Sequence, residues 1–128
     1  DSQGWPRPVI SQPPLSWLKR DQLTDSVALC ASNEIAVTPY QPLQGGLLTG
    51  KYQRGSALPA DSRAAESKWL DDPDNEMHTR LDAFMEEAVE RGLSPARYAI
   101  EWLLTQPGIT SVVVGAKRID QIKEVAGL

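Results

Sequence analysis

Short apolar segments alternate with helical segments along this chain, and this alternation limits the possible folds more than any other feature. β-branched residues dominate the segments 9–12, 35–38 and 109–114, which we predict to be strands. Helical spacing of apolar residues appears after each of them. Continuous apolar strands separated by helices indicate βα units around a parallel sheet.

The helices carry their own start and stop signals. Leu23, Val27 and Cys30 fall at helical spacing, and we expect Thr24 or Asp25 to cap this helix, which should end near Asn33. A second helix should cover about 76–91 and end at Gly92, and a third should begin at Ser94-Pro95 and stop at Pro107-Gly108. A last helix follows the turn 115–118. The expected buried faces are Leu81, Phe84, Met85, Ala88 and Val89; Ala99, Ile100, Leu103 and Leu104; and Ile119, Ile122 and Val125.

Two connections are rich in turn-forming or polar residues. Residues 44–55 are predicted to form a glycine-rich loop, and residues 56–77 a polar connection with a short helix over 62–70. A connection this long inside a compact domain is often a functional lid.

Composition excludes several classes of function. The net charge is −4 and the Lys and Arg residues are spread along the chain, which argues against nucleic-acid binding. No apolar run approaches the roughly 20 residues that cross a bilayer, so no membrane partner is expected. The single Cys30 is expected to be a buried packing thiol in a reducing, cytoplasmic setting. The single His78 and the acidic stretch 71–76 match no metal-binding pattern, so we predict no metal site.

The chain begins with Asp1 and ends within an apparent helix, and we therefore expect a fragment. Three βα units are too few to close a (β/α)₈ barrel, which takes about 250 residues, although they match three consecutive units of one. These patterns alone also leave a doubly wound sheet open.

Three longer motifs occur in order. They are GWPRPVISQPPLSWLKRD at 4–21, IAVTPYQPLQGGLLTGK at 35–51 and LSPARYAIEWLLTQPGITSVVVGAKRIDQIKE at 93–124. Together they resemble the aldo-keto reductase family, with details most similar to the long-loop branch that includes the potassium-channel β subunits. The resemblance implies an α/β fold in which residues 1–128 are the C-terminal half of a (β/α)₈ TIM barrel, about strands 6 to 8 with their helices, the N-terminal half being absent.

The family passes a hydride between NADPH and a carbonyl or alcohol, with a Tyr, Lys, Asp and His set that lies in the first half of the barrel. The resemblance therefore assigns no catalytic residue to this chain. Tyr40, Tyr52, Tyr98 and His78 are not given that role.

The resemblance does imply a cofactor site. Tyr40 is expected to stack on the nicotinamide, and the amide of Gln12 to bind its carboxamide. A loop is expected to surround the pyrophosphate, with Lys51 at its end and Arg63 in the long loop that covers the cofactor. That loop consists of Gln41, Pro42, Leu43, Gln44 and Gly45.

The last turn has the strongest physical basis. Gly115 and Ala116 lead into Lys117 and Arg118 at the start of the last helix, where free N–H groups and the helix dipole favour an anion. The adenosine 2′-phosphate fits such a site, so NADP is favoured over NAD. Gln121 and Glu124 lie one turn apart and are expected to reach the adenine.

The chain departs from the family pattern at several of these positions. Val125 stands where Asn is common, Gln41 where Ser is usual, and Lys117 where a small hydroxyl residue is common. Gln44-Gly45 replaces a small or basic pair. These differences bear on cofactor affinity and geometry.

The sequence thus predicts part of a cytoplasmic NADP-dependent oxidoreductase that reduces aldehydes or ketones, or oxidises the matching alcohols, and that is inactive as this fragment. The alternatives are a non-catalytic, cofactor-binding regulatory subunit of the same fold and a structural α/β domain without a cofactor. The expected partner is a small carbonyl substrate.

Overall fold

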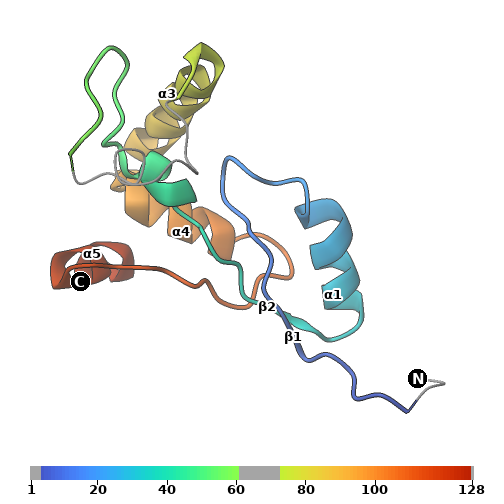
Figure 1. Cartoon of the computed structure of the whole chain (residues 1–128). Helices are drawn as coiled ribbons and strands as arrows, with labels where there is room; N and C mark the ends of the chain where they lie inside the picture. The colour runs from blue at the N-terminus through green and yellow to red at the C-terminus, as the bar shows by residue number, and fades with distance from the viewer. Residues whose placement is uncertain (1–3, 61–72, 128) are drawn as a thin grey trace.

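The computed structural model describes residues 4–60 and 73–127, and helices make up most of its regular structure (Figure 1). The predicted helix over 62–70 and the candidate Arg63 lie outside these residues. The order of elements is β1 (Ile10–Ser11), η1 (Leu23–Val27), α1 (Ala28–Ser32), β2 (Ala36–Val37), η2 (Gln44–Thr49), α3 (Asn75–Glu90), α4 (Pro95–Leu104) and α5 (Ile119–Ala126).

β1 and β2 pair in parallel, which confirms the predicted strand direction. The N–H of Ala36 donates to the carbonyl of Val9, and that of Thr38 to the carbonyl of Ser11, both at 2.9 Å. The pairing continues irregularly to a bridge between Pro14 and Tyr40. Tyr40 is thus held at the carboxyl end of the strand pair.

The predicted strand at 109–114 is wrong as regular structure, although its place beside β2 is as expected. The N–H groups of Thr110 and Val113 donate to the carbonyls of Val37 and Pro39, at 2.9 and 2.8 Å. However, the N–H of Val37 donates to the Thr110 hydroxyl at 3.2 Å and not to a backbone carbonyl. A side chain therefore takes a ladder position, and the segment is extended without being a regular strand.

The first helix begins one or two residues before the predicted caps. Its start, η1, follows Gln22, which makes no side-chain cap hydrogen bond, and the N–H of Val27 donates to the Gln22 carbonyl at 3.0 Å. Thr24 and Asp25 therefore lie inside the helix, and the predicted caps are wrong. The predicted end is confirmed, since Asn33 is the C-terminal cap of α1.

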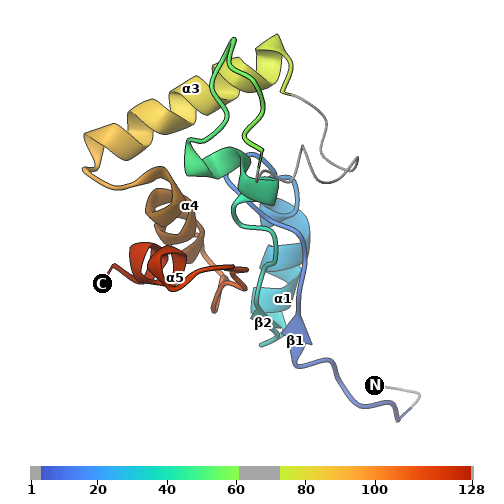
Figure 2. The ribbon, with the colours of Figure 1, turned by 60° about the vertical axis from the view of Figure 1, so that its left-hand side comes forward.

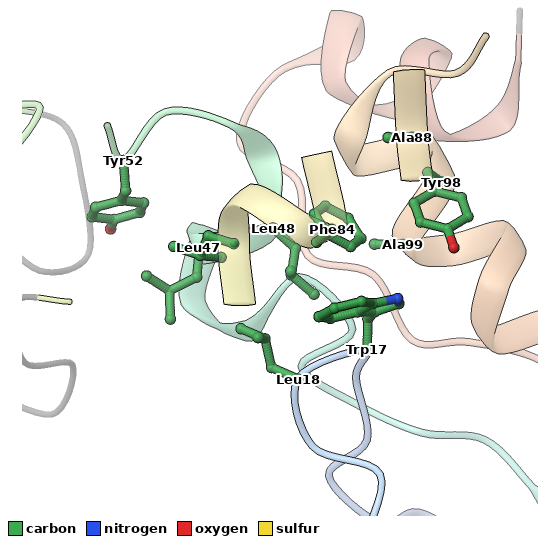
Figure 3. Close-up of a cluster of buried hydrophobic side chains, with 10 residues drawn as sticks. Trp17, Leu18, Leu47, Leu48, Tyr52, Phe84, Ala88, Tyr98 and Ala99 are labelled. Carbon is green, nitrogen blue, oxygen red and sulfur yellow. The ribbon is translucent and has the colours of Figure 1, made fainter. Parts of the chain in front are cut away.

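α3 lies within one residue of its predicted bounds, and the predicted start of α4 is confirmed, although α4 ends at Leu104, before Pro107. Ser94 is the N-cap of α4, with its side chain accepting from the N–H of Arg97 and Pro95 in the first turn. Gly92 ends α3 at a φ of 65°. Phe84 of α3 lies between Trp17 and Tyr98 at ring-centre distances of 5.3 Å, in a core that also holds Leu47 and Leu48 (Figure 3).

The predicted buried faces are correct near this core and wrong beyond it. Leu81, Phe84 and Ala88 are buried, as are Ala99, Ile100 and Leu103. Val89 is 73% exposed, and Leu104 and both isoleucines of α5 are also exposed. Within the described part of the chain, α5 has no buried residue. Cys30 is half-buried against a second cluster formed by Leu15, Val27, Val37 and Leu103.

Among the described residues, no helix has the length and apolar character needed to cross a membrane.

Candidate functional site

A cavity of about 700 Å³ lies between the segment that leaves β2 and the turn that enters α5. In Figure 2 the chain leading into α5 runs toward the segment after β2, and the hydrogen bond from Val113 to Pro39 joins the two. The volume of this cavity is within the range of small-molecule sites. The lining consists of Tyr40, Gln41, Pro42, Leu43, Gly45, Gly46, Thr49, Lys51, Val113, Gly115, Ala116, Lys117, Arg118 and Gln121.

One wall of the cavity is a tight loop with unusual backbone angles. Gln41, Gln44, Gly45 and Gly46 have φ values of 58°, 47°, 67° and 99°. The left-handed region disfavours residues with a Cβ, so both glutamines are held there by the surrounding structure. The Gln44 amide accepts a hydrogen bond from the fully buried Ser16 hydroxyl at 2.9 Å, which ties the loop to the strand exit.

Gly46 has a positive φ, and the Lys51 side chain packs closely against it. A Cβ at this position would lie 2.9 Å from Cε of Lys51 and 3.2 Å from its Nζ. The lysine stem therefore folds closely over the glycine, with Nζ 5.6 Å from the centre of the Tyr52 ring. This packing brings a cation to the wall of the cavity.

The opposite wall is the start of α5. The side-chain oxygen of Gln121 accepts from the backbone N–H groups of Lys117 at 2.8 Å and Arg118 at 3.2 Å. Arg118 also pairs with Asp120, with Nε 3.1 Å from Oδ1 and Nη2 3.1 Å from Oδ2. This hydrogen bond lowers the pKa of Asp120 below its ordinary value, so the carboxylate is charged at neutral pH.

The charges of the lining favour an anionic ligand. Lys51, Lys117 and Arg118 contribute cations, and no carboxylate occurs among the described lining residues. A cleft lined by one sign of charge concentrates ligands of the opposite sign. The described lining also holds no imidazole, and Tyr40 is its only phenol.

The structure brings together most of the residues that the sequence suggested for a cofactor site, and three of the described ones are not in the cavity lining. Gln12 is exposed at the end of β1, and Glu124 is exposed one turn beyond Gln121. Gln44 is next to the cavity but turned to Ser16, and Arg63 is outside the described residues. The ligand contacts of all these residues remain predictions.

Gly46, Thr49 and Val113 line the cavity and were not among the predicted site residues. Gly46 and Thr49 belong to the glycine-rich run at 45–51, and the Thr49 hydroxyl donates to the Gly46 carbonyl at 2.7 Å. The glycine-rich run was therefore the sequence signal that could have identified Gly46 and Thr49. Val113 gave none, because only the tertiary pairing with Pro39 turns it to this cavity.

An α/β unit with a cavity at the carboxyl end of its parallel strands defines a class of ligand-binding proteins. The aldo/keto reductase family model matches residues 1–128. The chain is 32% identical over 122 residues to a "probable voltage-gated potassium channel subunit beta" of Arabidopsis thaliana, covering 91% of this chain and 37% of that protein. It is 35% identical over 114 residues to L-glyceraldehyde 3-phosphate reductase of Escherichia coli K12, covering 84% and 32%.

A solved structure agrees with these sequence matches. The glycerol dehydrogenase of Gluconobacter oxydans superposes with a TM-score of 0.71 at 29% identity, covering 93% of this chain and 37% of that one. The chain belongs to the aldo/keto reductase family, as the sequence motifs indicated. It spans about a third of the length of the relatives it matches.

Proposed function

We propose that this chain is the C-terminal, cofactor-binding part of an NADP-dependent oxidoreductase of the cytoplasm that acts on aldehydes, ketones or the matching alcohols. The observation that carries the proposal is one cavity lined by Tyr40, a positive-φ glycine loop and the cationic turn before α5. When bound, the nicotinamide would supply the hydride to a carbonyl carbon or accept it from an alcohol. The residues of this chain bind and orient the cofactor.

Each wall of the cavity suits a different part of a dinucleotide. The ring of Tyr40, 38% exposed, is available for stacking on a flat ring. The loop at 41–46 with Lys51 suits the pyrophosphate, because glycines permit a close approach of backbone N–H groups. Lys117 and Arg118 suit a dianionic 2′-phosphate, which is the group that separates NADP from NAD.

The site is tested by Arg118→Glu, with NADPH and NADH titrated separately into the purified chain. A charge-assisted hydrogen bond to phosphate is worth about 1.5 to 3 kcal/mol, so NADPH affinity should fall by roughly ten- to a hundredfold. NADH affinity should change much less. The control is Lys123→Glu, which makes the same charge change at an exposed position of α5 outside the cavity lining.

Equal losses for both cofactors would contradict the 2′-phosphate assignment. Absence of any binding to the unmodified chain would favour a structural α/β domain without a cofactor.

The second candidate is a non-catalytic regulatory subunit that keeps the cofactor site. The similarity to a protein described as a potassium-channel β subunit favours it. The residues that precede this segment in a longer protein discriminate the two, because an intact Asp, Tyr, Lys and His set there supports an enzyme. For either candidate, we propose that the 128-residue chain alone is catalytically inactive.

A further inference from the structure

The turn before α5 satisfies its own donors. One side-chain oxygen of Gln121 accepts from two successive N–H groups, those of Lys117 and Arg118. The carboxylate of Asp120 accepts from Nε and Nη2 of Arg118. An anion that approaches this turn therefore meets donors that already have partners.

Of these contacts, the ion pair between Arg118 and Asp120 has the larger effect on the charge that an approaching phosphate meets. Nε and Nη2 form one of the two edges of the guanidinium that can bind a phosphate through two parallel hydrogen bonds. Asp120 also places a full negative charge within 3.3 Å of that edge. The pair has no net charge, so Asp120 reduces the attraction that Arg118 alone would exert on a phosphate.

We propose that Asp120 is a specificity-determining residue, whose pairing with Arg118 weakens the preference of this site for a 2′-phosphorylated nucleotide over its unphosphorylated counterpart. The inference rests on the proposed cofactor site. It goes beyond that proposal because it assigns selectivity to an acidic residue that does not line the cavity.

The pair is exposed, and this sets the size of the effect. The Arg118 and Asp120 side chains have relative accessibilities of 59% and 64%. Exposed ion pairs contribute little, so removing the carboxylate should strengthen binding of a 2′-phosphate by about two- to fivefold. The two ligands that isolate this effect are adenosine 2′,5′-bisphosphate and adenosine 5′-monophosphate, which differ only in the 2′-phosphate.

The test measures dissociation constants of the purified chain for both nucleotides by calorimetry, with and without Asp120→Asn. We expect the variant to bind the bisphosphate about two- to fivefold more tightly. Its dissociation constant for the monophosphate should change by less than about twofold. The matched control is Asp82→Asn. Asp82 pairs with Arg54 at 3.3 Å with accessibilities of 64% and 48%, and neither residue lines this cavity. This variant should leave both constants unchanged.

Three results would overturn the inference. An unchanged ratio of the two constants would show that Asp120 does not set selectivity, and weaker bisphosphate binding would show that it orients Arg118 for the phosphate. In both cases the cofactor site itself would stand. If the unmodified chain bound neither nucleotide nor NADPH, the proposed function would fail together with the inference.

Discussion

Glu87 joins three parts of the chain through a single carboxylate oxygen. Its Oε2 accepts from Nε1 of Trp17 at 3.0 Å and from the hydroxyl of Tyr98. Trp17 precedes η1, Glu87 lies on α3 and Tyr98 on α4, and both donor rings pack against Phe84 (Figure 3). Hydrogen bonds to a charged acceptor are stronger than neutral ones, so the Glu87 carboxylate should fix the orientation of α3 and α4 on the core.

Tyr98→Phe should lower the free energy of unfolding at pH 7 by about 1.5 to 3 kcal/mol, since it removes a hydrogen bond to a charged group. Urea unfolding measures this change. Tyr40→Phe is the control, because the same atom is removed from a partly exposed ring outside the core clusters. A loss below about 0.5 kcal/mol for Tyr98→Phe would contradict a stabilising role for the Glu87 group.

Tyr98 should also make the free energy of unfolding depend on pH. Burial, and then the hydrogen bond to Glu87, raise the pKa of Tyr98 above its ordinary 10.0. The unfolded chain therefore loses this proton at a lower pH than the folded chain, and the stability from Tyr98 is complete below pH 10 and falls as pH rises. The difference in unfolding free energy between the unmodified chain and Tyr98→Phe should therefore narrow as the pH rises above 10, which urea unfolding at increasing pH measures.

At this scale the sequence identified which residues line the cavity better than it identified their contacts. Tyr40, Lys51 and Arg118 were predicted from local motifs, and all line the cavity. Gln44 and Gln121 were expected to face a ligand, yet their amides bond to Ser16 and to the turn before α5. Side-chain direction depends on partners that are distant in sequence or that form only when the backbone has folded.

Among the elements, α4 offers the clearest test of a sequence signal. Ser94 accepts a hydrogen bond from the N–H of Arg97 at 3.4 Å, and Tyr98, Ala99 and Leu103 of this helix are buried in the two cores. Ser94→Ala should cost about 0.5 to 1 kcal/mol of unfolding free energy, as loss of a helix cap does. Thermal and urea unfolding measure it.

Ser94→Asp is the matched comparison, because aspartate caps helices about as well as serine and should leave stability within a few tenths of a kcal/mol. Equal losses for both variants would indicate that the hydroxyl acts through packing and not as a cap.

Elements with two agreeing signals were predictable, and those with one were not. α3 and α4 combine apolar periodicity with end signals, and both occur as expected. Residues 109–114 had only their β-branched composition, and the Thr110 hydroxyl interrupts the ladder there. α5 follows the turn at 115–118 as expected, but none of its described residues is buried. Periodicity shows which face of a helix is apolar and does not show what covers it.

For the whole molecule, the order of βα units was predictable and their assembly was not. The parallel direction of β1 and β2 follows from the alternation of strands and helices. The choice between a doubly wound sheet and a (β/α)₈ barrel depends on strands that this sequence does not contain. The match to the aldo/keto reductase family decides this choice in favour of the barrel. The assignment of this segment to barrel strands 6 to 8 is still a proposal that rests on the order of the motifs.

The proposed separation of binding from chemistry concerns the whole chain. The described cavity lining supplies cations, a glycine loop and one aromatic ring, but no carboxylate or imidazole that could relay a proton. General acid–base catalysis needs a proton donor or acceptor within hydrogen-bonding distance of the reacting atom, and the family resemblance gives that role to no residue of this chain. We therefore expect the purified 128-residue chain to bind NADPH without consuming it when aldehydes are added.

NADPH absorbance measures consumption, and the E. coli L-glyceraldehyde 3-phosphate reductase serves as the active control. Turnover by the chain at rates near those of that enzyme would mean that catalytic groups lie within these 128 residues, and the division between a binding part and a catalytic part would be wrong.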